Sequence, residues 1–160
     1  MDIITKRAII IVLSYHHMNT EKVARSIAAV LNAEVKRPQD ITPEQLSGYA
    51  LVGIGAGIDS GKHYKPILEF AEKLLPSEGQ KAFIFSTAGV TGMQKTLNDH
   101  KTLRDILLSK GYDVVDEFGC KGFDTNSFLK FIGGIGKGRP NDEDLKNAAD
   151  FARKLEQYLA

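Results

Sequence analysis

Apolar and polar positions alternate along the chain in blocks that predict strands and helices in turn. Residues 8–13 (AIIIVL) are apolar without interruption, which is typical of a strand buried on both faces. Between Thr20 and Leu31 the apolar side chains recur with a helical period, which predicts an amphipathic helix. The same alternation continues to the C-terminus. It predicts strands at 7–13, 34–36, 49–55, 81–86 and 112–118, and helices at 20–31, 64–75, 97–109 and 140–159.

This alternation predicts a fold class. Strands that alternate with helices form a parallel sheet covered by helices on both faces. Because crossover connections are right-handed, the pattern predicts a doubly wound α/β domain with five strands. The chain has no internal repeat and no linker long enough to divide it, so we expect a single domain over residues 1–160.

Composition and charge narrow the classes of partner. Lys and Arg together number 21 and Asp and Glu 20, which leaves a formal net charge of +1. This balance argues against nucleic acid and an anionic membrane surface as partners. The single cysteine, Cys120, excludes an intramolecular disulfide framework and fits a reducing, cytoplasmic setting. The N-terminal apolar run is too short to span a membrane, and we do not expect a signal peptide.

The fold class also predicts where a ligand binds. In doubly wound sheets, ligands lie beyond the carboxyl ends of the strands. The connections at that edge are residues 14–20, 55–63, 86–92 and 119–139, all rich in Gly, Ser or Thr. The last of them is much longer than the usual βα loop, and long loops are usually functional or disordered.

The first connection has two readings. A helix start offers N–H groups without partners and a positive dipole end, so residues 14–20 suit a phosphate. The same residues also fit an ordinary strand–helix turn in which Asn19 and Thr20 cap the helix. The local pattern alone leaves both readings open.

Two glycine-rich stretches fail as nucleotide motifs. In 133–138, Lys137 is followed by Gly138 where a phosphate-binding loop needs Ser or Thr, and no apolar strand precedes the stretch. The glycines at 53, 55 and 57 do not open a helix after the first strand, so they are not a dinucleotide fingerprint.

Reactive side chains form no obvious catalytic set. His16 and His17 are adjacent, and His63 and His100 are isolated in the sequence, so we expect no metal site. Cys120 lies beside a lysine without a paired histidine, so we expect a packed thiol. No Ser-His-Asp arrangement and no pair of carboxylates stands out.

Across nearly its whole length the chain resembles the flavodoxin family. In that family the turn after the first strand is rich in Ser and Thr and ends in Gly-Asn-Thr, and this chain matches it at Ser14, Asn19 and Thr20. It departs at His17, where the family usually has threonine, and at Met18, where the family usually has glycine. Residues 120–125, together with 133–134 and 138–141, also look like a subgroup of small flavodoxin-like proteins from anaerobic microbes.

The resemblance implies a fold and a cofactor. The fold is a flavodoxin-like three-layer sandwich with strand order 2-1-3-4-5, and the cofactor is FMN. The first turn would wrap the phosphate, the connection 56–63 would flank the isoalloxazine, and 87–89 would meet its pyrimidine edge. The implied cofactor-binding residues are Ser14, His16, His17, Met18, Asn19, Thr20, Ala56, Gly57, Ile58, Asp59, Ser60, Gly61, Thr87, Ala88, Gly89 and Phe123.

Some of the implied roles stay open. Because the chain has no tryptophan, Ile58, Tyr64 or Val90 would have to stack on the flavin. Phe123 would either cover the edge of the ring or anchor its own loop in the core.

Two functions follow from the resemblance. The first is a one-electron carrier that uses FMN and exchanges electrons with redox partner proteins. The alternative is an FMN-dependent oxidoreductase, such as a quinone reductase or a protoporphyrinogen dehydrogenase-like enzyme. A flavin-free phospho-receiver would need acidic residues after the first strand, where this chain has Ser14, Tyr15 and His16. The sequence leaves the oligomeric state open.

Overall fold

Five parallel strands form the central sheet, in the order β2-β1-β3-β5-β6. The computed structural model describes residues 6–15, 18–123 and 136–160. The strands are β1 (Ala8–Leu13), β2 (Glu34–Lys36), β3 (Leu51–Asp59), β5 (Lys81–Ala88) and β6 (Asp113–Lys121). A short strand, β4 (Lys62–His63), pairs antiparallel with the end of β3. The expected flavodoxin-like sheet of order 2-1-3-4-5 is therefore confirmed, with β5 and β6 as its fourth and fifth parallel strands.

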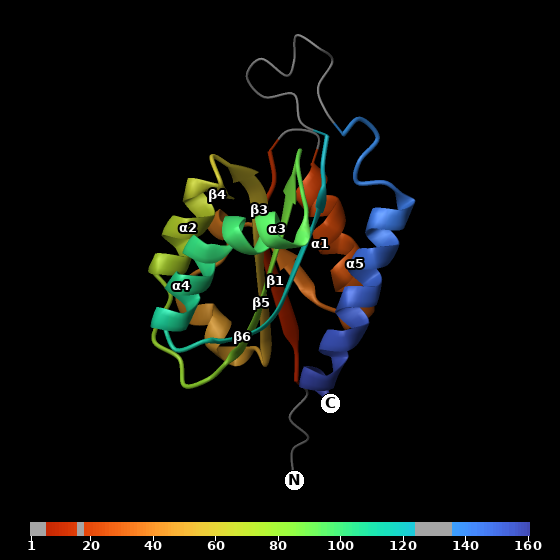
Figure 1. The fold of residues 1–160 in the computed structure, drawn as a ribbon. Helices are drawn as coiled ribbons and strands as arrows, with labels where there is room; N and C mark the ends of the chain where they lie inside the picture. The colour runs from red at the N-terminus through yellow and green to blue at the C-terminus, as the bar shows by residue number, and fades with distance from the viewer. Residues whose placement is uncertain (1–5, 16–17, 124–135) are drawn as a thin grey trace.

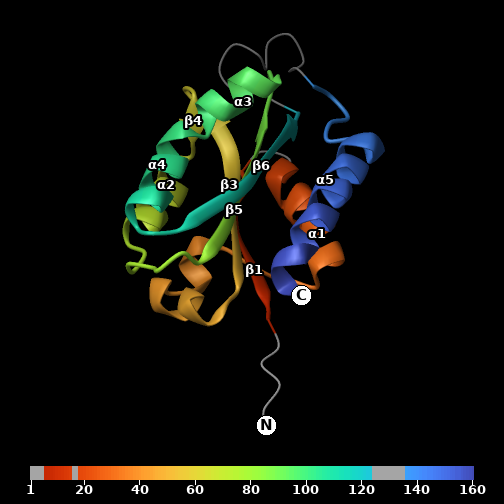
Figure 2. The same cartoon turned by 60° about the horizontal axis from the view of Figure 1, so that its bottom comes forward.

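Helices cover both faces of the sheet (Figures 1 and 2). One face carries α1 (Asn19–Leu31) and α5 (Asp142–Leu155), and the other carries α2 (Lys65–Glu72) and α4 (Lys101–Ser109). The other helical segments in the described ranges are α3 (Met93–Asp99), η1 (Pro38–Asp40), η2 (Pro43–Gly48) and η4 (Glu156–Leu159). Both termini of the described chain lie at the edge opposite the carboxyl ends of the strands (Figure 1).

Two hydrophobic cores separate the sheet from its helices. In β1, Ile10 and Val12 face α1 and α5, while Ile9 and Ile11 face the other layer. Successive strand residues point to opposite faces, so an uninterrupted apolar run fills both cores at once. This is why the strands were readable from the sequence.

The structure departs from the predicted elements in two places that matter for the site. The strand predicted at 49–55 begins at Leu51 and runs on to Asp59, where it turns into β4. The single helix predicted at 97–109 is two helices, α3 and α4, separated at His100. α3 has no apolar face that a pattern could show, because Met93 and Leu97 are exposed and Asp99 is its only buried residue.

The carboxyl ends of the parallel strands meet at one edge of the sheet, at the top of Figure 1. The N-terminus of α1, the β3–β4 turn and α3 lie at the same edge. Within the described ranges, none of the helices has the length and apolar character needed to span a membrane.

Candidate functional site

The turn between β1 and α1 leads directly into a buried helix start. Ser14 Oγ accepts a hydrogen bond from the backbone N–H of Glu21 at 3.3 Å, which ties the end of β1 to the first turn of α1. The first backbone N–H groups of a helix have no partner within the helix, and Asn19 and Thr20 occupy these positions. Their side chains are only 8% and 2% exposed. His16 and His17 lie outside the described residues.

Side-chain hydrogen bonds join this helix start to two distant strands. Thr20 Oγ1 lies 2.8 Å from Thr87 Oγ1 at the end of β5. Asn19 Nδ2 donates to the carbonyl of Phe123, just beyond β6, at 2.9 Å. The backbone N–H of Gly122 donates in turn to the carbonyl of Ala88 at 3.0 Å. The structure therefore brings together predicted site residues that are about a hundred positions apart in the sequence.

One atom at this junction lacks a partner. Asn19 Oδ1 is buried and accepts no hydrogen bond from any residue that the structure describes. An unsatisfied buried acceptor costs free energy, and such atoms in folded proteins usually mark a missing ligand, ion or water. The amide nitrogen is fixed by Phe123, so the oxygen stays free to accept from a bound molecule.

The predicted loop at 55–63 is instead a strand and a tight hairpin. Ser60 and Gly61 have φ values of +53° and +79° and connect Asp59 to Lys62. Two central residues with positive φ are the requirement of a type I′ turn. Ala56 is fully buried within β3, between β1 and β5, so the structure does not bring it to the exposed edge. Ile58 and Asp59 form the last, partly exposed positions of the strand.

An aromatic pair covers the next predicted residue, Gly57. The backbone N–H of Tyr64 donates to the Gly57 carbonyl at 3.1 Å. A Cβ placed at Gly57 would come within 2.4 Å of the Tyr64 hydroxyl oxygen, so a side chain here would displace this ring. The ring of Tyr64 also packs against Tyr15, with ring centroids 5.1 Å apart. Sequence reasoning missed Tyr15, although its position directly after Ser14 is the signal that could have found it.

The histidines predicted to be isolated are in contact. The His63 and His100 rings lie 4.9 Å apart, because the β3–β4 hairpin carries His63 back toward α4. His100 Nδ1 donates to the Glu117 carboxylate at 3.0 Å, and Ser86 Oγ lies 2.7 Å from His100 Nε2. His63 Nε2 lies 3.0 Å from the carbonyl oxygen of Phe85. The expectation that His63 and His100 are isolated is therefore wrong, and Ser86, His100 and Glu117 form a hydrogen-bonded set between β5, α4 and β6.

The electrostatics of this cluster point to a structural role. Burial, followed by the nearby His100, lowers the pKa of His63 to about 3. Burial alone would raise the pKa of Glu117, but hydrogen bonds from His100 and Arg104 outweigh it and lower the pKa to about 2. Ser86 and His100 are buried, so a substrate does not reach them.

Cys120 is not a reactive thiol, and the described residues form no metal site. Burial, with the nearby charge of Asp144, raises the pKa of the Cys120 thiol to about 12, so the thiolate is not formed near neutral pH. The prediction of a packed thiol agrees with this burial. Among the residues that the structure describes, no cluster of His, Cys, Asp and Glu could hold a metal ion.

Comparison with known proteins assigns the chain to a family. A model of the flavodoxin domain matches residues 10–124, well over half of the chain. The chain belongs to the flavodoxin family. An uncharacterized protein of Methanocaldococcus jannaschii is 43% identical over 149 residues, which cover 93% of this chain and 97% of that protein.

Solved flavodoxins share the fold of this family member at low sequence identity. Oxidised flavodoxin 2 of Bacillus cereus has a TM-score of 0.72 and 15% identity, and the match covers 94% of this chain and 98% of that one. The Fusobacterium nucleatum flavodoxin bound to flavin mononucleotide has a TM-score of 0.65 and 12% identity, over 96% and 99% of the two chains. At these identities the likeness establishes the fold alone.

The departure of this flavodoxin at Met18 has a measurable consequence. Met18 adopts φ +57°, a left-handed conformation that costs a residue with a Cβ about 1–2 kcal/mol. Its side chain is 47% exposed, so little packing is lost on removal. We expect Met18→Gly to raise the free energy of unfolding by about 0.5–1 kcal/mol, measured by urea denaturation.

The matched control is Met93→Gly. Met93 is also exposed but begins the regular helix α3, where glycine is expected to lower stability. Equal destabilisation of both variants would contradict the strain assigned to Met18.

Proposed function

We propose that this flavodoxin-family protein binds FMN and acts as a one-electron carrier between protein partners in the cytoplasm. The observation that carries the proposal is the buried, unpartnered Asn19 Oδ1 at the junction of α1, β5 and β6. The family membership supports the flavin as the ligand class.

The described residues fit the two ends of FMN. The N-terminus of α1 and the hydroxyl of Ser14 suit the phosphate, since helix N–H groups and the helix dipole favour an anion. His16 and His17 remain predicted phosphate neighbours. The residues proposed to meet the isoalloxazine are the Gly57–Gly61 hairpin, the segment 87–89 and Phe123.

The protein's own part in the reaction is to bind, orient and shield. When bound, FMN supplies the redox chemistry, and the protein tunes it through contacts and charge. The hairpin is held in register by the pairs of Ile58 with His63 and Asp59 with Lys62, so its turn presents a defined edge. The Thr20–Thr87 hydrogen bond fixes the phosphate turn relative to the end of β5. Rigid positioning of this kind keeps the reorganisation on electron transfer small.

Asn19→Ala is expected to weaken FMN binding about tenfold, because a buried acceptor and its orienting amide are both lost. The measurement is the quenching of FMN fluorescence on titration with the flavin-free protein. Asn147→Ala, an exposed position on α5, is the matched control and is expected to bind like the wild type.

Three outcomes of this titration are informative. A wild-type protein that is colourless and ignores added FMN contradicts the proposed function. If Asn19 only anchors Phe123, the variant loses stability in urea but keeps its FMN affinity, and the role of Oδ1 fails. A tenfold loss of FMN affinity in Asn19→Ala, with Asn147→Ala unchanged, supports both FMN binding and the role of Asn19 Oδ1.

A second function is favoured by one observation. A cavity of about 350 Å³ lies between α3 and the edge strand β6, beside the end of β5. Its lining is Thr91, Gly92, Met93, Thr96, Leu97, Glu117, Phe118 and Gly119. A mostly apolar cavity next to the proposed flavin site would suit a small substrate of an FMN-dependent oxidoreductase, such as a quinone. Rapid quinone reduction with NADH or NADPH by the purified protein would support this alternative; no turnover with either donor would favour the carrier.

A further inference from the structure

A second cavity opens beside the first turn of α1, where β2 ends early. β2 pairs with β1 only through Ile9, Ile10 and Ile11. Pro38 follows immediately after Arg37, and because proline lacks a backbone N–H it cannot extend the ladder. The chain therefore turns away into η1, and the outer side of β1 at Val12 borders a cavity of about 280 Å³.

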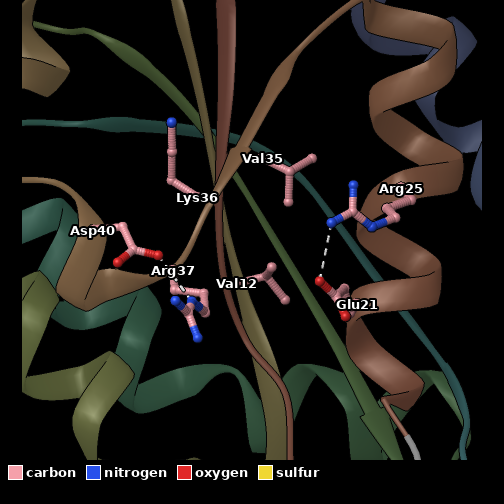
Figure 3. A pocket seen from close by; sticks show the side chains of 7 residues that line it. All are labelled: Val12, Glu21, Arg25, Val35, Lys36, Arg37 and Asp40. Carbon is pink, nitrogen blue, oxygen red and sulfur yellow. Dashed lines mark hydrogen bonds and ion pairs between the residues drawn. The ribbon is translucent and has the colours of Figure 1, made fainter.

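Charged pairs from two elements wall this cavity (Figure 3). On the α1 side, Arg25 is paired with Glu21 at 3.1 Å. On the η1 side, Arg37 is paired with Asp40 at 2.8 Å. Lys36 also lines the cavity and has no ion-pair partner among the residues that the structure describes. The wall thus offers three cations and two carboxylates, which leaves one positive charge uncompensated.

The floor of the cavity is apolar. Val12 and Val35 lie between the two charged walls in Figure 3. An apolar floor suits the face of a purine base, a carboxylate accepts hydrogen bonds from ribose hydroxyls, and Arg or Lys pairs with phosphate. In Rossmann-type dinucleotide-binding domains, an acidic side chain hydrogen-bonds the ribose hydroxyl and an arginine accommodates the ribose phosphate in this way.

We propose that this cavity binds an adenosine phosphate group. The position of the cavity supports the proposal. Glu21 lines the cavity and also belongs to the first turn of α1, where its backbone N–H donates to Ser14 Oγ. A phosphate bound at the N-terminus of α1 and an adenosine phosphate bound in the cavity would therefore both lie beside the first turn of α1. The group can therefore come from two sources: the AMP half of FAD, or a separate nucleotide such as ADP or NADPH. Only the FAD source rests on the proposed flavin function.

The test compares ligands that differ in this group alone. The flavin-free protein is titrated with FMN, FAD, ADP and NADPH by calorimetry, as wild type, Lys36→Glu and Lys73→Glu. Lys73 is an exposed lysine just beyond α2, so its variant makes the same charge change away from the cavity. We expect ADP, which carries the adenosine phosphate group without a flavin, to bind the wild type and Lys73→Glu alike, and Lys36→Glu to weaken this binding about tenfold. A preference for FAD over FMN that Lys36→Glu removes would assign the group to FAD.

The titrations distinguish FAD from a separate nucleotide as the source of the group, and they test the cavity separately from the proposed flavin function. Equal affinities for FAD and FMN, with ADP or NADPH binding that Lys36→Glu weakens, support a separate nucleotide. ADP binding of this kind in a protein that binds no flavin leaves the inference standing and overturns the flavin function. Tight FMN binding with no FAD preference, and no binding of ADP or NADPH, overturns the inference and leaves the flavin function intact.

Discussion

At pH 5 the protein is expected to be about 2 kcal/mol less stable than at pH 7, because folded His63 does not accept a proton in this range. The ring is buried against His100, and its pKa is about 3 against 6.5 for an ordinary histidine. Below pH 6.5 the unfolded chain binds a proton at this residue and the folded chain does not. Stability therefore falls with pH from 6.5 down to about 3.

Glu117 extends this loss to lower pH. Its pKa in the folded state is about 2 against 4.5 for the free side chain, so its stabilising contribution is complete above pH 4.5 and disappears as the pH falls toward 2. The two windows overlap only below pH 4.5. Of these two groups, only His63 contributes between pH 6.5 and 4.5.

Urea denaturation at pH 7 and pH 5 measures the effect. In His63→Gln the amide can still donate to the Phe85 carbonyl, which lies 3.0 Å from His63 Nε2, but it does not titrate. The variant is expected to lose most of the difference between the two pH values. An independent readout is the ring chemical shift of His63, which should report a neutral imidazole down to about pH 4. A variant with the same pH dependence as the wild type would show that other groups cause the acid sensitivity.

The histidine cluster also marks the limit of sequence reasoning for this protein. His63 and His100 are separated by α2, β5 and α3, and their contact depends on the register of a hairpin. The Ser60-Gly61 pair, which requires positive φ, was a readable turn signal between Asp59 and Lys62. The sequence does not give the register of this hairpin, however, and so did not show that His63 would face His100.

By contrast, the edge that carries the candidate site followed from pattern alone. Apolar runs located the parallel strands, and the switch-point rule then placed the ligand edge at their carboxyl ends. The hydrogen bonds that join Asn19 to Phe123 and Thr20 to Thr87 were not readable, because side-chain pairing across the sheet depends on tertiary packing. The same holds for the burial of Ala56, which depends on how far β3 extends.

The glycines of β3 have a packing role that the sequence did not reveal. They were correctly excluded as a dinucleotide motif, but their purpose was not visible in the sequence. Gly53 pairs with Phe83, and Gly55 with Phe85, on the neighbouring strand β5. Each phenylalanine ring lies across the glycine opposite, at the place where a side chain would stand. The alternation of glycine in one strand and phenylalanine in the next is therefore a packing device between adjacent strands.

Gly53→Ala is accordingly expected to lower the free energy of unfolding by about 3 kcal/mol, at the upper end of the usual cost of overpacking. The added Cβ would lie 2.2 Å from one ring atom of Phe83 and within 2.7 Å of two others. Phe83 is fully buried and also packs on Phe151, so the ring has no free space to enter. Urea denaturation measures the loss, and Gly48→Ala, where nothing lies within 4 Å of the new Cβ, is the matched control with an expected change below about 0.5 kcal/mol.

A double-mutant cycle assigns that loss to the ring. Phe83→Leu alone is expected to cost about 1–2 kcal/mol because a smaller side chain leaves part of the core unfilled. In Gly53→Ala/Phe83→Leu the new methyl group occupies some of that space, so the double variant is expected to be about 2 kcal/mol more stable than the sum of the single changes predicts. Additive losses would mean that the cost at Gly53 arises in the β3 backbone and not in its contact with Phe83. A positive coupling would establish that the glycines of β3 are kept small by the aromatic residues of β5, which fixes the two central strands that lead to the candidate site.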